Sequence, residues 1–364
     1  MQDSVRPKPV VLLILDGWGV GPNNAGNAIE LASTPNMDKF HVIYPNGLLE
    51  ASGVAVGLPK GEDGNTETGH LNIGAGRIVY QDLPRINMAI ADGSFGRNPA
   101  FQQAFEHVKR NNSVLHLIGL VGSGGVHSNI SHLYALLATA KQAGFDGNVF
   151  VHAITDGRDS PPTSGIDYIT QLQEQMKQLG VGQLATVMGR YFAMDRDHRW
   201  ERTQVAYDAI TVGSNTCTTD VGGAIRTSYT AGKTDEFIEP VSVCGQDGAH
   251  RIIQDNDAII FFNFRIDRPR QLTKAFVLPN FESGSHSEGF DPYAVKYNKS
   301  HLQQQTTQSQ TFQRKKILQN IMFVTMTEYE KGLSTIVAFS PEFVAMPLGR
   351  VFSERGLRQL RMCE

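Results

Sequence analysis

The stretch VLHLIGLVGSGGVHSNISHLYALLATAKQAG, Val114 to Gly144, reads as a strand, a loop and a helix in succession. Its first seven residues are apolar apart from one histidine and one glycine, which predicts a strand buried on both faces. From Ile130 onward the apolar side chains recur at helical spacing, and Gly144 suits the position just after a helix. A buried strand followed by a helix is the repeating unit of an α/β fold.

The same order recurs along the chain. Apolar runs that end in loops rich in glycine, aspartate or arginine occur at residues 10–15, 149–154, 184–188 and 258–262. A second helical pattern spans residues 166–180 and also ends in a glycine. Further strands are predicted at residues 321–329, 335–339 and 357–362, with a short helix that ends at Gly356. Because ligands bind beyond the carboxyl ends of parallel strands, the loops after these runs are expected to line one site.

Length and composition describe a globular protein. A chain of 364 residues exceeds one ordinary core and favours two domains. Hydrophobic residues make up 40% of the chain and charged residues 19%, which argues against a largely disordered protein. The formal net charge of -3 predicts neither a nucleic-acid nor a membrane partner, so a small molecule is the expected ligand.

The cysteines and the N-terminus indicate a reducing compartment. Cys217, Cys244 and Cys363 are an odd number, far apart in the sequence and without the spacing of a metal motif. Asp16 interrupts the apolar N-terminal run before it reaches membrane-spanning length, and no targeting signal is recognised. A cytoplasmic protein with reduced cysteines is therefore expected.

Asp16 and Thr66 are candidates for metal binding and nucleophilic attack. Asp16 follows the first predicted strand, where its carboxylate could bind a hard cation or cap the next turn. Thr66, in GNTETGH, is expected at a helix N-terminus, where it could serve as a nucleophile or as the N-cap. A bound cation would favour the nucleophile, because it lowers the pKa of the hydroxyl.

Five arginines and one histidine follow the predicted strands: His127, Arg158, Arg190, Arg196, Arg265 and Arg268. Planar guanidinium groups bind carboxylate and phosphate in bidentate fashion, so a converging set suits a small anion with several charges. The interleaved Asp159, Asp195 and Asp267 could instead neutralise the arginines in structural ion pairs. His127 is a candidate proton carrier at the same edge.

Five long motifs resemble those of the cofactor-independent phosphoglycerate mutases, metal enzymes of the alkaline phosphatase superfamily. They are GNTETGHLNIGAGR, GGVHS, DGRDSPPTSG, GRYFAMDRDHRWER and FFNFRIDRPRQ. The resemblance runs from Val10 to Gln271 and resumes at Phe323. It implies an enzyme of glycolysis and gluconeogenesis that interconverts 3- and 2-phosphoglycerate through a phosphorylated hydroxyl residue. It also implies two divalent cations, usually manganese, and no bisphosphoglycerate cofactor.

The resemblance assigns roles to individual residues. Thr66 stands at the position of the phosphorylated serine, which is also a metal ligand, and Asp16 matches a metal-binding aspartate. Contacts with substrate are implied for His127, Arg158, Asp159, Arg190, Arg196, Arg265 and Arg268.

The implied architecture is α/β, with two three-layer α/β/α domains, the second inserted into an alkaline-phosphatase-like domain. Residues 1–82 and 317–364 are expected to form the phosphatase-like domain, and residues 83–275 the inserted transferase-like domain. The polar, glutamine-rich residues 276–316 are expected to be a flexible linker. The family suggests a monomer.

The sequence departs from the family pattern in three respects. Thr66 replaces a serine, and its β-methyl group predicts slower turnover. Ser123 and Asn129 stand where the family has aspartate and histidine. The remaining metal ligands of the family have no counterpart here, which implies a truncated phosphatase-like domain. A catalytically inactive relative that only binds phosphoglycerate is therefore one alternative, and a phosphomonoester hydrolase is the other.

Overall fold

The computed structural model describes residues 9–245, 248–283 and 311–362. The chain divides into two compact units, one of Met1–Val79 with Val344–Glu364 and one of Tyr80–Phe343. Each unit is described by itself.

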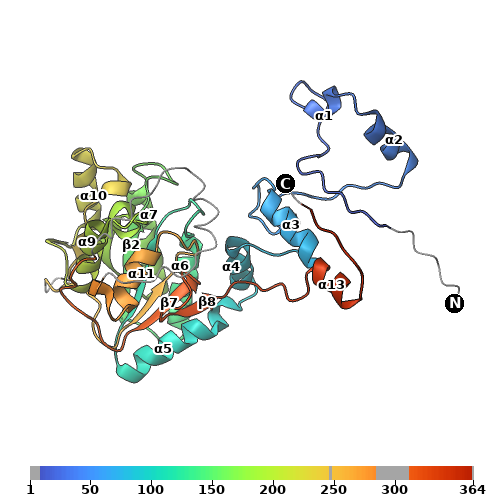
Figure 1. Cartoon of the computed structure of the whole chain (residues 1–364). Helices are drawn as coiled ribbons and strands as arrows, with labels where there is room; N and C mark the ends of the chain where they lie inside the picture. The colour runs from blue at the N-terminus through green and yellow to red at the C-terminus, as the bar shows by residue number, and fades with distance from the viewer. Residues whose placement is uncertain (1–8, 246–247, 284–310, 363–364) are drawn as a thin grey trace. The chain divides into compact units, whose positions relative to one another are not determined.

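The second unit is built on an eight-stranded sheet in the described residues, with strand order β4-β5-β3-β2-β1-β6-β7-β8. Figure 1 labels β2, β7 and β8 of this sheet. Its strands are β1 (Leu115–Leu120), β2 (Val149–Thr155), β3 (Gln183–Gly189), β4 (Thr216–Thr218), β5 (Val241–Val243), β6 (Ala258–Phe261), β7 (Met322–Thr327) and β8 (Ile336–Phe339). Neighbouring strands run parallel except β3 and β5, which are antiparallel. The predicted α/β fold is therefore confirmed for this unit.

Side chains of the central strands alternate between two hydrophobic cores, one on each face. Leu115 and Leu117 of β1 belong to one core, whereas Ile118 and Leu120 belong to the other. This two-residue period follows from strand geometry, and burial on both faces explains why β1 is an almost unbroken apolar run.

Helices cover both faces of this sheet. The core that contains Leu117 is covered by α4 (Asp82–Ala91), α5 (Pro99–Asn111), α6 (Ile130–Gln142), α7 (Gly165–Leu179) and α10 (Val221–Thr230). The core that contains Ile118 is covered by α8 (Arg190–Ala193), α9 (Trp200–Thr211) and α11 (Arg270–Val277). Short 3₁₀ helices are η2 (Phe95–Arg97), η3 (Asp235–Phe237) and η4 (Phe281–Ser283). Among the described residues, no helix has the length and apolarity required to cross a bilayer.

Most predicted elements of this unit are confirmed. Strands occupy six of the predicted runs, at residues 114–120, 149–154, 184–188, 258–262, 321–329 and 335–339. The two helical patterns correspond to α6 and α7. Gly180 ends α7 with a φ of 65°, in the left-handed region where glycine carries no steric penalty.

The first unit contains helices α1 (Ala28–Leu31), α2 (Pro35–Ile43), α3 (Thr66–Ala75) and α13 (Leu348–Glu354) and the 3₁₀ helix η1 (Gly53–Val56), and no strand in its described residues. The prediction of a buried strand at residues 10–15 is wrong, because Val10 is 84% exposed and no described segment pairs with this run. The strand predicted at residues 357–362 is likewise absent. An apolar run needs partner strands for its backbone N–H and C=O groups, so composition alone does not make it a strand. The three-layer phosphatase-like domain that was expected here is not formed by the described residues of this unit.

The division into units differs from the expected one near the C-terminus. Residues 317–364 were expected to join the N-terminal segment, but β7 pairs with β6 and β8 pairs with β7 in the sheet of the second unit. Of the predicted flexible segment 276–316, residues 284–310 lie outside the described residues. Its described flanks are packed: Thr311 donates a hydrogen bond to the Phe281 carbonyl at 2.7 Å, and both residues are buried.

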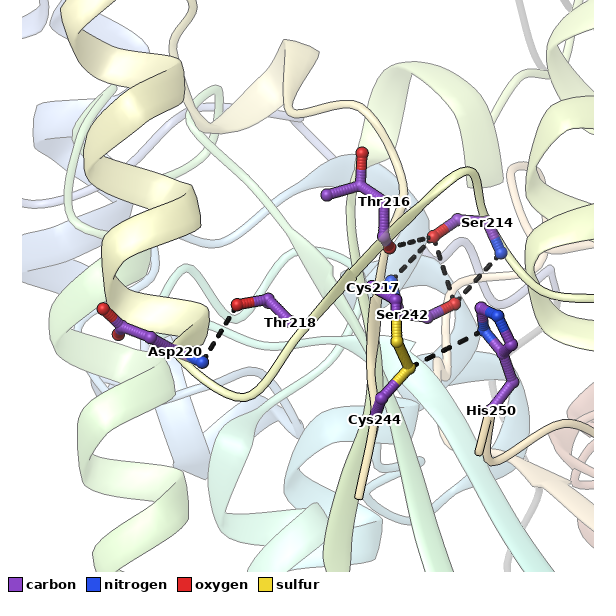
Figure 2. Close-up of a disulfide and its surroundings, with 8 residues drawn as sticks. All are labelled: Ser214, Thr216, Cys217, Thr218, Asp220, Ser242, Cys244 and His250. Atoms are coloured by element: carbon purple, nitrogen blue, oxygen red, sulfur yellow. Dashed lines mark hydrogen bonds between the residues drawn. A yellow bond between two sulfur atoms is a disulfide. The ribbon is translucent and has the colours of Figure 1, made fainter. Parts of the chain in front are cut away.

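Two of the cysteines form a disulfide, Cys217 with Cys244, which their sequence separation of 27 does not suggest (Figure 2). They come together because β4 and β5 are neighbours in the sheet. The expectation of reduced cysteines is therefore wrong for Cys217 and Cys244.

A line of buried polar side chains crosses the sheet. His116 Nδ1 lies 2.9 Å from His152 Nε2, and His152 Nδ1 lies 3.0 Å from Thr186 Oγ1. At the other end, His116 Nε2 lies 3.1 Å from Asp257 Oδ2. Burial lowers the pKa of both histidines below the usual value, and for His116 the nearby Asp257 opposes this effect only in part.

These histidines predict acid sensitivity of the second unit. Unfolded histidines take up protons below about pH 6.5, whereas the folded pair does not, so the free energy of unfolding should fall as pH drops through this value. Each histidine should contribute up to about 1.4 kcal/mol per pH unit. Urea unfolding, followed by the fluorescence of buried Trp200 in a Trp18→Phe background, measures this slope. His152→Gln should make the slope shallower. If the free energy of unfolding of His152→Gln depended on pH as steeply as that of the parent protein, the prediction would be contradicted.

Candidate functional site

Four loops of the second unit bring the predicted ligand residues together. His127 follows β1, Arg158 and Asp159 follow β2, Arg190 follows β3, and Arg265 and Arg268 follow β6. These four strands are adjacent and parallel, in the order β3-β2-β1-β6, so the loops emerge at the same edge of the sheet. The backbone joins two of them directly, because Phe264 N donates to the His127 carbonyl at 2.8 Å.

Arg190 lies at the centre of this group, and its side chain is only 2% exposed. Its Nη1 lies 2.6 Å from Asp156 Oδ1 and 2.5 Å from Asp159 Oδ2, and its Nη2 lies 3.0 Å from His127 Nε2. A buried guanidinium is tolerated only with such partners. The Nε of Arg190 is buried without a hydrogen-bond partner in the described residues.

Asp156 was missed by the sequence reasoning. Its Oδ1 accepts hydrogen bonds from the backbone N–H groups of Arg158 and Asp159, at 3.2 and 3.1 Å. Its Oδ2 accepts from the Ser160 hydroxyl at 3.1 Å. The carboxylate thus fixes the loop that carries Arg158 and Asp159 while it also neutralises Arg190. An aspartate followed by glycine at the end of a buried strand is the signal that could have identified it.

His127 is held neutral. Burial, followed by the charge of Arg190, lowers the pKa of His127 to about 4, although Asp267 and Asp159 act in the opposite direction. Because Arg190 Nη2 can only donate, His127 Nε2 must accept, so Nδ1 carries the proton. This Nδ1 lies 3.8 Å from Asp267 Oδ1, too far for a direct hydrogen bond, and is buried without a hydrogen-bond partner in the described residues. Asp267 Oδ1 instead lies 3.2 Å from Arg265 Nε.

Three arginines are partly exposed around this centre. Asp267 lies 2.6 Å from Arg196 Nη1 and 3.2 Å from Arg265 Nε, while each arginine side chain keeps nearly half of its surface exposed. Arg158 is 57% exposed and lies 3.7 Å from Glu236. These guanidinium groups have a carboxylate on one side and solvent on the other, so they can accept a second anion.

Arg268 lacks such a partner. Its Nη1 donates to the Met194 carbonyl at 3.1 Å, and no carboxylate of the described residues lies within 4 Å of its guanidinium. Burial, followed by the charges of Arg190 and Arg196, lowers the pKa of Arg268 below the usual value. Its positive charge is destabilised by this burial and by these neighbouring charges, and would be stabilised by an anion.

Asp195 has a structural role. Its side chain is 2% exposed and lies 3.2 Å from Arg199 Nη1 and 3.6 Å from Arg202 Nη1. It also accepts a hydrogen bond from Gln271 Nε2 at 3.1 Å. The segment from Met194 to Trp200, which carries the partly exposed Arg196, is anchored in this way.

The two substituted positions next to His127 do not hydrogen-bond to it. Asn129 is the N-cap of α6 and accepts from Ser131 N at 2.9 Å. The Ser123 hydroxyl pairs with the Tyr168 hydroxyl at 2.5 Å. The hydrogen bonding of His127 is therefore provided by Arg190 and does not depend on either position.

Thr66 and Asp16 meet in the first unit. The Thr66 hydroxyl donates to Asp16 Oδ2 at 2.5 Å, and both residues are exposed. Thr66 is the first residue of α3, and the N-cap is Asn65, whose side chain accepts from Thr68 N at 2.9 Å. The hydroxyl of Thr66 is therefore not needed for capping. The alternative that Thr66 is itself the N-cap is therefore wrong.

The oxygen atoms of Thr66 and Asp16 could bind the same hard cation. They fit a manganese or magnesium site only in part. No group of three or more Asp, Glu, His or Cys ligands surrounds this pair among the residues that the structure describes.

Comparisons with known proteins agree with these motifs. Residues 86–331 match the family described as BPG-independent PGAM N-terminus (iPGM_N). The chain is 48% identical to the 2,3-bisphosphoglycerate-independent phosphoglycerate mutase of Chloroflexus aggregans over 360 residues, and 46% identical to that of Clostridium perfringens. These alignments cover 99% and 98% of this chain.

The relatives are longer than this chain, which spans 65% of the Chloroflexus aggregans protein and 64% of the Clostridium perfringens protein. Among solved structures, Leishmania mexicana phosphoglycerate mutase at low cobalt concentration matches with a TM-score of 0.64 and 28% identity. That match covers 94% of this chain and 59% of the other. The chain therefore belongs to the family of BPG-independent phosphoglycerate mutases.

Proposed function

We propose that the chain acts in the interconversion of 3-phosphoglycerate and 2-phosphoglycerate, the activity for which its relatives are named. The observation that carries this proposal is the Arg268 guanidinium, which is partly buried among other arginines without a carboxylate partner in the described residues. A small molecule with both phosphate and carboxylate groups would supply the missing negative charge.

The two units are proposed to divide the chemistry. The first unit would be the phosphatase-like part, in which the Thr66 oxygen forms a bond to phosphorus while the bond from phosphorus to the substrate oxygen breaks. The second unit would be the transferase-like part, whose arginines hold the glycerate. The proton that leaves the Thr66 hydroxyl would pass to the freed glycerate oxygen. The glycerate would then turn, and its other hydroxyl would bond to phosphorus as the bond from phosphorus to the Thr66 oxygen breaks and the proton of that hydroxyl returns to Thr66.

His127 and Asp159 are proposed to orient the glycerate hydroxyls. Burial alone would raise the pKa of Asp159, but its hydrogen bond and charge pairing with Arg190 lower it overall, so it acts as a carboxylate acceptor. The neutral His127 would offer its Nδ1–H as a donor. Asp159 Oδ2 lies 3.5 Å from Nε2 of the imidazole, not at Nδ1, so the two residues would contact different hydroxyl groups of the glycerate.

The proposal includes two divalent cations, both manganese. Asp16 and Thr66 would supply part of their ligands. Such ions lower the pKa of a hydroxyl nucleophile and stabilise the charge of a phosphoryl group. The family requires no bisphosphoglycerate cofactor. We further propose a monomer that acts in the cytoplasm.

A mutase assay with added manganese, which follows both 2-phosphoglycerate and free phosphate, tests the proposal. Formation of 2-phosphoglycerate from 3-phosphoglycerate is the expected result. Free phosphate alone would identify a phosphomonoester hydrolase. Neither product, with binding retained in calorimetry, would identify a protein that only binds phosphoglycerate.

Substitution of Thr66 should change turnover in two directions. Thr66→Val keeps the shape but removes the hydroxyl, so 2-phosphoglycerate formation should fall to the background of the assay. Thr66→Ser removes the methyl that restricts χ1, a restraint of about 0.5–1.5 kcal/mol, so turnover should rise roughly two- to tenfold. The rate in the mutase assay is the measurement. A Thr66→Ser rate equal to that of the parent would contradict the proposed effect of the methyl group.

Substitution of Arg268 should weaken ligand binding without loss of fold. Arg268→Gln removes a charged donor that contributes about 1.5–3 kcal/mol, so the Kd for 3-phosphoglycerate in calorimetry should rise roughly 10- to 150-fold. The matched control is Arg110→Gln, an equal change of charge at an exposed position of α5. Equal affinities of the two variants would argue against an anion site at Arg268.

A further inference from the structure

Two cysteines and a histidine meet at the edge of the sheet where β4 pairs with β5 (Figure 2). Cys217 lies in β4, Cys244 directly follows β5, and His250 lies beyond the next loop. Their ligand atoms all lie within 4.8 Å of one another, and His250 Nδ1 is 3.9 Å from Cys244 Sγ. In the described residues this is the only cluster of three or more potential metal ligands.

The cluster is separate from the arginine site. Because β5 is antiparallel to β3, Ser242 pairs with Thr186 and the chain then runs toward the start of β3. Arg190 instead follows the end of β3. The cysteines and the arginines therefore lie toward opposite ends of the sheet, and the proposed reaction uses none of the three cluster residues.

The backbone holds the two cysteines in place independently of the bond between them. Cys244 N donates to the Thr218 carbonyl at 3.0 Å, and the Ser214 hydroxyl accepts from Ser242 N at 2.7 Å. The Cα atoms of Cys217 and Cys244 are 5.7 Å apart. These contacts would persist if the disulfide were reduced, so two thiols would remain side by side.

Gly213 leaves space for the imidazole of His250. A Cβ at this position would lie 2.8 Å from His250 Nδ1, so the imidazole can approach the cysteines only because residue 213 has no side chain. Its φ of +112° also favours glycine. The approach of His250 is thus built into the local backbone.

We propose that the reduced protein binds one zinc ion through Cys217, Cys244 and His250. Two thiolates and one imidazole are a donor set that favours Zn²⁺ over the hard cations bound by oxygen ligands. A tetrahedral ion with Zn–S of about 2.3 Å and Zn–N of about 2.0–2.1 Å places sulfur and nitrogen about 3.6 Å apart. The distance of 3.9 Å between Cys244 Sγ and His250 Nδ1 is already close to this geometry.

The two sulfur atoms have only to move apart, which rotation about their Cα–Cβ bonds allows. The fourth position would be filled by water, because Cys217 is exposed to solvent while Cys244 is buried. Cys244 also borders a surface hollow of about 480 Å³, which gives the ion a path of entry.

Zinc and the disulfide exclude one another, since both use the same two sulfur atoms. A small disulfide such as glutathione disulfide would oxidise the thiolates: one sulfur–sulfur bond forms in the protein and one breaks in the reagent. The reagent takes up two electrons and two protons and leaves as two thiols, and the zinc ion is released. The disulfide between Cys217 and Cys244 is then the oxidised form of the site.

Cobalt is the probe for this site, because its bonds to thiolate give an intense charge-transfer absorption that oxygen ligands do not. The titration uses reduced protein in a Cys363→Ser background, so that the third cysteine cannot contribute. We expect one equivalent of Co²⁺ to bind with this absorption, Zn²⁺ to displace it, and glutathione disulfide to abolish it. A signal that depends on sulfur also separates this site from the Thr66 and Asp16 oxygens.

Variants complete the test. Cys217→Ser and Cys244→Ser should each lose at least half of the absorption. His250→Gln and Gly213→Ala, which leave both sulfurs in place, should weaken cobalt affinity about tenfold or more. Absence of thiolate absorption in the reduced protein would overturn the proposal, as would absorption and affinity that are unchanged in Cys217→Ser or His250→Gln.

Discussion

The buried guanidinium of Arg190 determines how the ligand site is arranged. A positive charge with 2% exposure is tolerated only while its partners are present, and loss of one partner from such a pair costs about 3–5 kcal/mol. Those partners are Asp156 and Asp159 after β2 and His127 after β1, whereas Arg190 itself follows β3. The loops of three adjacent strands are therefore coupled electrostatically and cannot move independently without exposing an unpaired charge.

This coupling divides the arginines into two kinds. Arg190 is committed to internal carboxylates and maintains the shape of the site. Arg158, Arg196, Arg265 and Arg268 keep exposed surface or lack a carboxylate partner in the described residues, and these are the groups that can exchange one anion for another. A site that must hold a product and release it again needs both kinds, because a ligand that provided the only counter-charge could not leave without disrupting the loops.

The sequence predicted those features that depend on local pattern. Apolar runs with glycine-rich ends located β1, β2, β3 and β6, and the parallel order of these strands is enough to bring His127, Arg190 and Arg268 to one edge. The N-terminal run at residues 10–15 has the same composition but no partner strand in the described residues, so its pattern was misleading. Asp156 was missed because its function is to hold other loop residues, and the pairing of Cys217 with Cys244 depends on strand order, which no local pattern contains.

The reversed direction of β5 gives the sheet two chemically different ends. Charged guanidinium groups occupy one end and soft sulfur atoms the other, so reagents that react with thiols have no target among the residues proposed to hold an anion. After reduction, a fluorescent label on the exposed Cys217 would sit toward the opposite end of the sheet from the proposed anion-binding loops. A label on Cys217 would therefore allow motion of the second unit to be followed by energy transfer while a ligand binds.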